Sequence, residues 1–172
     1  MNAFPPEDIR GFLQLCAGEW LSLRSVLETE TPEGTGSLHG TGELLDAAQG
    51  WHHADRGELT VAFLEAEEPG ECGGLDVGLP TGSTVRLVFR GDGSVVLAGD
   101  SGRWLLASDG TLELSLEKDG GVVKERIWFS KPNLRLRCTL EQARDGSPGR
   151  ASFSSEIRRV RAPAKTTAPV EN

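Results

Sequence analysis

Residues 125–139, ERIWFSKPNLRLRCT, carry the clearest strand pattern of the chain. Alternate residues of a β-strand face opposite sides of a sheet, so Arg135, Arg137 and Thr139 share one face. The other face of the same segment holds two leucines and a cysteine. A Lys-Pro-Asn segment at 131–133 separates this strand from the one before it. We therefore predict a hairpin of which one strand has an apolar face and a doubly cationic face.

Short strands of the same kind recur on both sides of this hairpin. Glycine-containing turns follow several of them, and a spacing of about ten residues between such strands is typical of a sandwich or a barrel. Sequential hairpins favour an up-and-down meander, and closure into a barrel removes exposed edges. We expect strands at 20–29, 59–65, 84–90, 95–97, 103–107, 111–117, 122–129, 134–140 and 150–160.

The remaining segments predict a short helix, a turn and a tail. Over Pro5–Leu15, apolar residues fall on one face at spacings of three and four, and the acidic residues Glu7 and Asp8 suit a first helical turn. Segment 67–74 has the composition of a turn. Residues 161–172 lack any periodicity, and we expect a disordered tail after a single domain at 1–160.

Composition restricts the function classes. The net charge of −8 argues against nucleic acid or an anionic membrane as the main partner, because both require a basic surface. No apolar run approaches the ~20 residues needed to cross a bilayer, and the first ten residues do not resemble a signal peptide. Three widely spaced cysteines, Cys16, Cys72 and Cys138, favour free thiols in a reducing compartment.

The cationic face of 134–140 admits two interpretations. In the first, the leucines lie in the core and the arginines face water, as charged residues usually do. In the second, the arginines line a cavity, where they would be costly to desolvate unless anions met them. A ligand with carboxylates would supply bidentate hydrogen bonds. The residues alone leave both interpretations open.

Four motifs in order resemble the S/U-type phycobilin lyases: AGEWLSLR at 17–24, ERIWF at 125–129, PNLRLR at 132–137 and ASFSSEIRR at 151–159. The resemblance implies a lipocalin-like closed antiparallel up-and-down β-barrel with a short N-terminal helix. It also implies binding of an open-chain tetrapyrrole (phycocyanobilin or phycoerythrobilin) as substrate, with no tightly bound cofactor. The tetrapyrrole would be attached by a thioether bond to a cysteine of an apo-phycobiliprotein subunit.

The same resemblance implies partners and a compartment. Members of this family act alone, as homodimers or as heterodimers of S- and U-type paralogues, in the cyanobacterial cytoplasm or plastid stroma. Two other roles stay open: a U-type subunit that stabilises an S-type lyase, and a carrier of bilin or of a fatty-acid-like anion. No nucleic acid and no membrane insertion are expected.

Site residues follow from the resemblance, position by position. The pocket arginines would be Arg24, Arg135 and Arg137, which suit the two propionates of a bilin. The acidic residues would be Glu125 and Glu156, in catalytic roles. A carboxylate can hydrogen-bond the pyrrole nitrogens, and one with a pKa raised by burial can protonate the tetrapyrrole and activate it toward the thiol.

Other side chains complete the expected site. Thr139 falls where the family has a small hydroxyl residue, and Trp104 and Trp128 are expected to wall the chromophore. Cys138 lies on the leucine face, so we expect it to be buried and not a nucleophile. The neighbouring His52 and His53 would point to opposite faces of a strand, so no metal site is expected.

Overall fold

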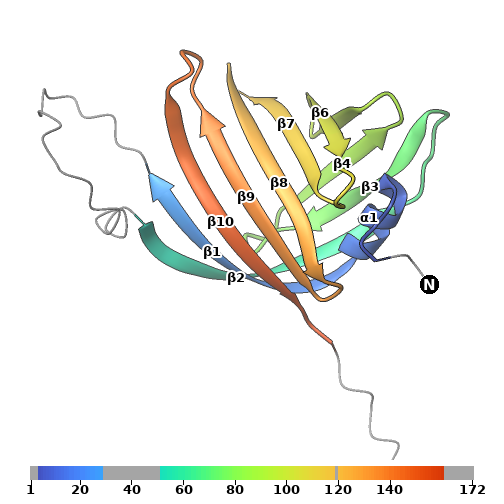
Figure 1. Cartoon of the computed structure of the whole chain (residues 1–172), viewed down its shortest axis with the longest axis horizontal. Coiled ribbons are helices and arrows are strands. Elements are labelled where there is room, and N and C mark those ends of the chain that lie inside the picture. The colour runs from blue at the N-terminus through green and yellow to red at the C-terminus, as the bar shows by residue number, and fades with distance from the viewer. Residues whose placement is uncertain (1–3, 29–50, 119, 161–172) are drawn as a thin grey trace, which may run out of the picture.

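The computed structural model describes residues 4–28, 51–118 and 120–160. In this part, ten strands form one closed barrel in the order β1-β10-β9-β8-β7-β6-β5-β4-β3-β2, and every neighbouring pair is antiparallel (Figure 1). This confirms the predicted antiparallel up-and-down barrel. The elements are α1 (Ile9–Cys16), β1 (Gly18–Glu28), β2 (Trp51–Leu64), β3 (Glu71–Gly78), β4 (Thr84–Arg90), β5 (Ser94–Leu97), β6 (Asp100–Leu106), β7 (Leu112–Lys118), β8 (Gly121–Lys131), β9 (Leu134–Gln142) and β10 (Pro148–Arg158).

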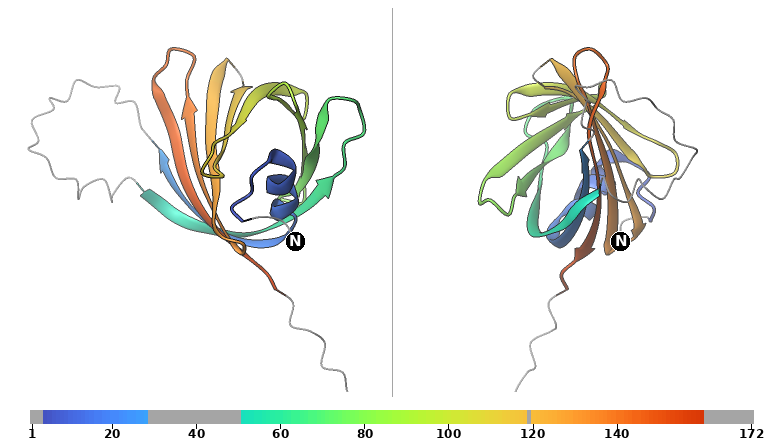
Figure 2. Two further views of the ribbon diagram at one scale, coloured as in Figure 1. Left: turned by 45° about the vertical axis from the view of Figure 1, so that its right-hand side comes forward. Right: turned by 90° about the vertical axis from the view of Figure 1, so that its left-hand side faces the viewer.

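The helix lies in one end of the barrel (Figure 2). It begins one turn later than predicted, because Asp8 is the N-cap and accepts a hydrogen bond from the Gly11 amide at 2.6 Å instead of lying in the first turn. One face of the helix is buried, and Phe12 meets the Phe129 ring of β8 at a centroid distance of 5.3 Å. The helix therefore plugs this end of the barrel, which we call the closed end.

Side chains of the first and last strands hold the helix in place. The Trp20 indole N–H donates to the Cys16 carbonyl at 2.8 Å. Arg158 donates to the Leu15 carbonyl at 2.5 Å and also to the carbonyl of Ala17. These are carbonyls that the end of a helix leaves without an intrahelical partner. The helix thus packs against the inner faces of the barrel strands.

Strand β3 occupies the second half of a predicted turn, and a turn remains at residues 69–70. Segment 67–74 suggested a turn because it is rich in glycine, but its last residues pair with β2 and β4. A Cβ atom at Gly74 would come within 2.5 Å of the Leu87 carbonyl oxygen. Glycine at this position therefore permits close approach of two strands. Strand β2 is also longer than predicted, and the predicted tail at 161–172 lies outside the described residues.

The inner face of the barrel changes character along its axis. Phe12, Trp20, Phe89, Leu112 and Phe129 form the centre of an apolar core near the closed end. Toward the other end, inward positions on β1, β8, β9 and β10 become polar. The opposite end, which we call the open end, thus has a polar interior.

Candidate functional site

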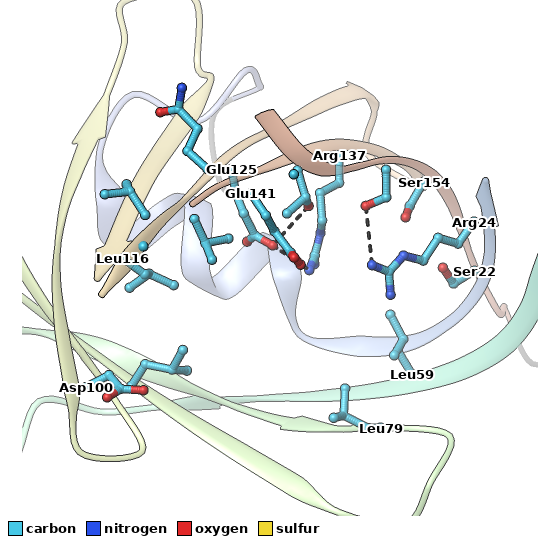
Figure 3. Close-up of a pocket in the computed structure, with 18 of the residues that line it drawn as sticks. Ser22, Arg24, Leu59, Leu79, Asp100, Leu116, Glu125, Arg137, Glu141 and Ser154 are labelled. Carbon is cyan, nitrogen blue, oxygen red and sulfur yellow. Dashed lines mark hydrogen bonds and ion pairs between the residues drawn. The ribbon is translucent and has the colours of Figure 1, made fainter. Parts of the chain in front are cut away.

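A cavity of about 1070 Å³ occupies the open end of the barrel (Figure 3). This volume lies just above the range of roughly 300–1,000 Å³ that is typical of small-molecule sites. Its apolar surface comes from single residues on several strands, including Leu59, Leu97, Leu116 and Val123. Its polar surface comes mainly from β1, β8, β9 and β10, the strands that carry the sequence motifs.

The cationic face of β9 points into the barrel, but its residues lie at different depths. Arg137 and Thr139 line the cavity. Arg135 lies closer to the helix, its side chain is only 2% exposed, and it does not line the cavity. The prediction that Arg135 lines the pocket is therefore wrong. Alternation along the strand determines the face correctly, but it does not give the distance from the plugged end.

Arg135 and Glu156 form a buried ion pair. The two residues face each other across β9 and β10, and the Arg135 Nε–H donates to Glu156 Oε2. The guanidinium also lies over the Trp20 ring, 4.6 Å from its centroid. The other carboxylate oxygen of Glu156 reaches toward the cavity and lies 3.7 Å from Arg137 Nη2. Glu156 therefore links the buried arginine to the arginine at the cavity wall.

Glu125 provides a second carboxylate on the other side of Arg137. Its Oε1 lies 3.9 Å from Arg137 Nη1 and accepts a hydrogen bond from the Thr139 hydroxyl at 3.1 Å. Burial lowers the pKa of Arg137, but Glu156 and Glu125 raise that pKa by more, so the net shift is upward. Arg137 is therefore held as a cation between two carboxylates, and the buried Nε lacks a hydrogen-bond partner.

Arg24 lies on β1, beyond β10 from Arg137. It lines the cavity, and its Nη2 donates to the Ser152 hydroxyl at 3.4 Å. Ser22 and Ser154 line the same wall (Figure 3). These serines were not predicted as site residues. For Ser152 and Ser154 the sequence offers a signal, a polar row on alternate positions of 152–156, but exposure to solvent explains such a row equally well.

Charged residues that the resemblance did not suggest also line the cavity. Glu141 follows Thr139 on the inner face of β9 and lies beside Glu125 and Arg137 in Figure 3. The same alternation that identified Thr139 could have found Glu141. Four others line the cavity from β2, β6, β7 and the loop after β9: Arg56, Asp100, Glu117 and Arg144.

Neither predicted tryptophan lines the cavity. Trp128 lies between the inward Ile127 and Phe129, so it faces outward, where its ring packs against Phe153 at 6.4 Å. Trp104 faces inward but packs against Phe89 in the core and donates its indole N–H to the Arg90 carbonyl at 2.9 Å. Both predictions are therefore wrong. Aromatic residues suit a chromophore wall and a core equally well.

The cysteines are free and differ in exposure. Cys16 is buried on the helix, and burial raises the pKa of its thiol by more than the neighbouring Arg135 lowers it. Cys72 is partly buried. Cys138 is exposed, which contradicts the expected burial, because no layer covers this side of β9 in the described part of the chain.

No group of acidic, histidine or cysteine side chains among the described residues suits a metal ion. His39 and the side chains of His52 and His53 lie outside the described part.

The arrangement suits a ligand that carries both carboxylates and N–H groups. Arg24 and Arg137 present N–H donors to the cavity, and Glu125 and Glu156 present acceptor oxygens between and beside them. Charge-assisted hydrogen bonds of this kind are stronger than neutral ones. The apolar side chains on the remaining wall can pack against a flat, conjugated body.

Comparisons with known proteins identify one family. Residues 82–159 match the family model described as CpeS-like protein. Chromophore lyase CpcS/CpeS 1 of Paulinella chromatophora is 35% identical over 161 residues, which cover 92% of each chain. Chromophore lyase CpcS/CpeS 1 of Synechocystis sp. is 30% identical over 144 residues, covering 80% of this chain and 67% of that protein.

A solved structure supports the fold. The S-type phycobiliprotein lyase CPES from Guillardia theta superposes with a TM-score of 0.59 at 20% identity, covering 90% of this chain and 94% of the other. Among the described residues, no helix is both long and apolar enough to cross a membrane.

Proposed function

Since this chain belongs to the family of CpcS/CpeS chromophore lyases, we propose that it binds an open-chain tetrapyrrole in the cavity and attaches it to a phycobiliprotein subunit. The bond formed is a thioether to a cysteine of that subunit, and the bilin is phycocyanobilin or phycoerythrobilin. The observation that carries this proposal is the cluster of Arg137, Glu125, Thr139 and Glu156 facing a cavity of about 1070 Å³.

The arginines bind the propionates. Arg137 is about a quarter exposed, with a side-chain exposure of 26%, and its guanidinium is already oriented by two carboxylates. Arg24 offers a second guanidinium to the same cavity. One propionate on each arginine would hold the tetrapyrrole between them. Arg135 supports this site from below, because it fixes Glu156 and does not itself face the cavity.

Of the two carboxylates, Glu125 acts on the pyrrole nitrogens. Glu125 is positioned by Thr139, and its ion pair with Arg137 is long, so it remains available to accept an N–H or to pass a proton to the tetrapyrrole. Glu156 is committed to Arg135 and serves mainly to orient Arg137. In the reaction, the acceptor's thiol sulfur adds to the ring-A ethylidene and the thiol proton ends on the tetrapyrrole. The addition needs no oxidant or reductant.

Partners and compartment follow from the family. We propose that the chain acts alone, as a homodimer or with an S/U-type paralogue, in the cyanobacterial cytoplasm or plastid stroma. The curated relatives from Synechocystis and Paulinella support this placement. A role as a U-type partner or as a carrier would use the same cavity without independent transfer.

The test is a bilin titration followed by transfer. Purified protein is mixed with phycocyanobilin, phycoerythrobilin or a fatty acid, and binding is followed by absorbance or by displacement. An apo-phycobiliprotein subunit is then added with and without an S-type paralogue, and the covalent adduct is detected after denaturation. We expect saturable bilin binding and an adduct without the paralogue. Binding without any adduct identifies a carrier, an adduct only with the paralogue identifies a partner subunit, and absence of bilin binding refutes the proposal.

A further inference from the structure

The outer face of the barrel has an apolar region on β1, β9 and β10. Cross-strand register joins its members, because Leu21 pairs with Ile157, and Ile157 pairs with Leu134. Contiguous exposed apolar surface of this kind marks interaction sites. More than half of the exposed large hydrophobic side chains in the described part of the chain belong to it: Leu21, Leu23, Leu140, Phe153 and Ile157.

Part of this region is hollowed into a groove. A depression of about 420 Å³ lies over β8, β9 and β10, and we call it the outer groove. Two basic residues on β8 flank the groove, and the register pairs Lys124 with Leu140 and Arg126 with Cys138. The apolar side of the groove is formed by Cys138, Leu140, Ala151 and Phe153.

The charges at the groove favour an acidic partner. The whole chain carries a net charge of −8, yet the charged residues that line this groove are both cations. Arg126 has an ion pair with Glu113 at 3.1 Å, and Lys124 is exposed beside it. A second copy that used the same patch would place these cations against each other. A different protein with acidic residues around an apolar side chain would be complementary.

The groove lies directly behind the wall of the cavity and close to its mouth. Thr139 and Ser152 line both the groove and the cavity, so a single layer of strands separates them. Leu140 in the groove is two residues from Gln142, which lines the cavity, and two residues of a strand span about 7 Å. A protein seated in the groove would therefore lie beside the opening through which the ligand is reached.

We propose that the outer groove docks the acceptor protein. An apolar side chain of the acceptor packs over Cys138, Leu140 and Phe153, and neighbouring acidic residues meet Lys124 and Arg126. Docking there places the acceptor's cysteine at the open end. This inference rests on the proposed function, because only a lyase has an acceptor to position.

The cysteines provide a direct test. An apo-phycobiliprotein subunit that receives bilin in the assay above is added to the wild-type protein, and alkylation by a maleimide is mapped by peptide mass. We expect the acceptor to slow alkylation of Cys138 at least tenfold and to leave Cys72, on the other side of the barrel, unchanged as the internal control. Fast alkylation of Cys138 in a complex shown by sedimentation to be formed would overturn the proposal while leaving the lyase function intact.

Other outcomes are equally distinct. Protection of Cys138 that grows with the concentration of this chain alone would assign the groove to a second copy. Slow alkylation of Cys138 at every concentration without acceptor would assign it to a segment of the chain itself. Either result overturns the proposal. If no bilin is bound or transferred, the proposed function fails and the inference fails with it.

Substitutions in the outer groove give an independent readout. Lys124→Glu and Leu140→Ser should raise the KM for the acceptor at least tenfold and leave free bilin affinity unchanged. Matched controls are Arg90→Glu, an exposed cation on β4, and Leu105→Ser, an exposed leucine on β6. Equal KM values for the groove variants and their controls would place the docking surface elsewhere. Because all four side chains lie on the exterior, circular dichroism should show unchanged folding.

Discussion

The closed and open ends of the barrel use the same strands for different purposes. At the closed end, Arg135 is sealed between Glu156 and the Trp20 ring, beside the end of the helix. Toward the open end, Arg137 stands one pleat further along β9 and meets the cavity. Both arginines face inward and both contact Glu156. The difference teaches that depth along the barrel axis, set by the helix plug, decides whether a charged side chain supports the structure or meets a ligand.

Replacement of Arg135 should have the largest effect, on stability. Arg135→Ala leaves the Glu156 carboxylate buried without its main partner, and breaking a buried pair in this way costs roughly 3–5 kcal/mol. Urea denaturation measures the change in the free energy of unfolding. The double variant Arg135→Met/Glu156→Leu is the control, because it removes both charges and should recover much of the loss. A loss below about 1 kcal/mol for Arg135→Ala would remove the distinction between the two ends.

Glu125→Gln should act at the open end and chiefly on the reaction. The amide keeps the shape and can still meet Thr139, but it cannot transfer a proton. Loss of a positioned acid–base group lowers the rate about a hundredfold or more. We expect bound bilin with altered absorbance and slow thioether formation, measured by single-turnover transfer. Glu156→Gln is the comparison and should mainly reduce stability. Wild-type transfer by Glu125→Gln would exclude a proton-transfer role for this residue.

Arg137→Ala should weaken binding of the bilin more than it affects folding. A hydrogen bond to a charged group contributes about 1.5–3 kcal/mol, which corresponds to roughly tenfold or more in affinity. Absorbance titration gives the Kd, and urea denaturation of the same variant gives its stability. Arg90→Ala, an exposed arginine outside the cavity, is the matched control. Unchanged bilin affinity in folded Arg137→Ala protein would exclude a role of this arginine in bilin binding.

The smallest effect is expected at the N-cap of the helix. Asp8→Ala removes the hydrogen bond to the Gly11 amide and should cost about 1 kcal/mol of stability, which thermal unfolding can detect. Bilin affinity should not change, because Asp8 lies at the closed end. Asp8→Asn retains a capping oxygen and should lose less. A parallel loss of bilin affinity in Asp8→Ala would show that the plug shapes the cavity as well as sealing the barrel.

Local pattern predicted the strands that alternate cleanly and failed where tertiary contacts decide. The face of Arg137 and Thr139 followed from the two-residue period of β9. Strand β3 was missed because its glycines, needed for close strand approach, have the composition of a turn. Whether a strand side chain meets a ligand depends on what plugs the barrel, and no spacing within 134–140 contains that information.

The aromatic predictions failed for a related reason. Trp128 follows the same alternation as its neighbours, and its outward position could have been derived from Ile127 and Phe129 had either been known to be buried. Trp104 faces inward as a site residue would, but it lies among core side chains. The local sequence of a strand predicts which face a side chain is on. It does not predict which side chains from other strands will be its neighbours inside the barrel.

The seam between β1 and β10 has a consequence for the order of events in folding. The guanidinium of Arg158 reaches the Leu15 carbonyl across 143 positions of the chain, so the ring closes only between its earliest and latest strands. During synthesis β1 can pair with β2, but the other edge of β1 and the helix carbonyls that Arg158 binds must wait for β10. Bringing such distant segments together costs loop entropy and slows folding. Before β10 pairs with β1, the helix lacks its hydrogen bonds to Arg158. The nascent chain is most prone to aggregate during this interval, because its apolar surface is still exposed.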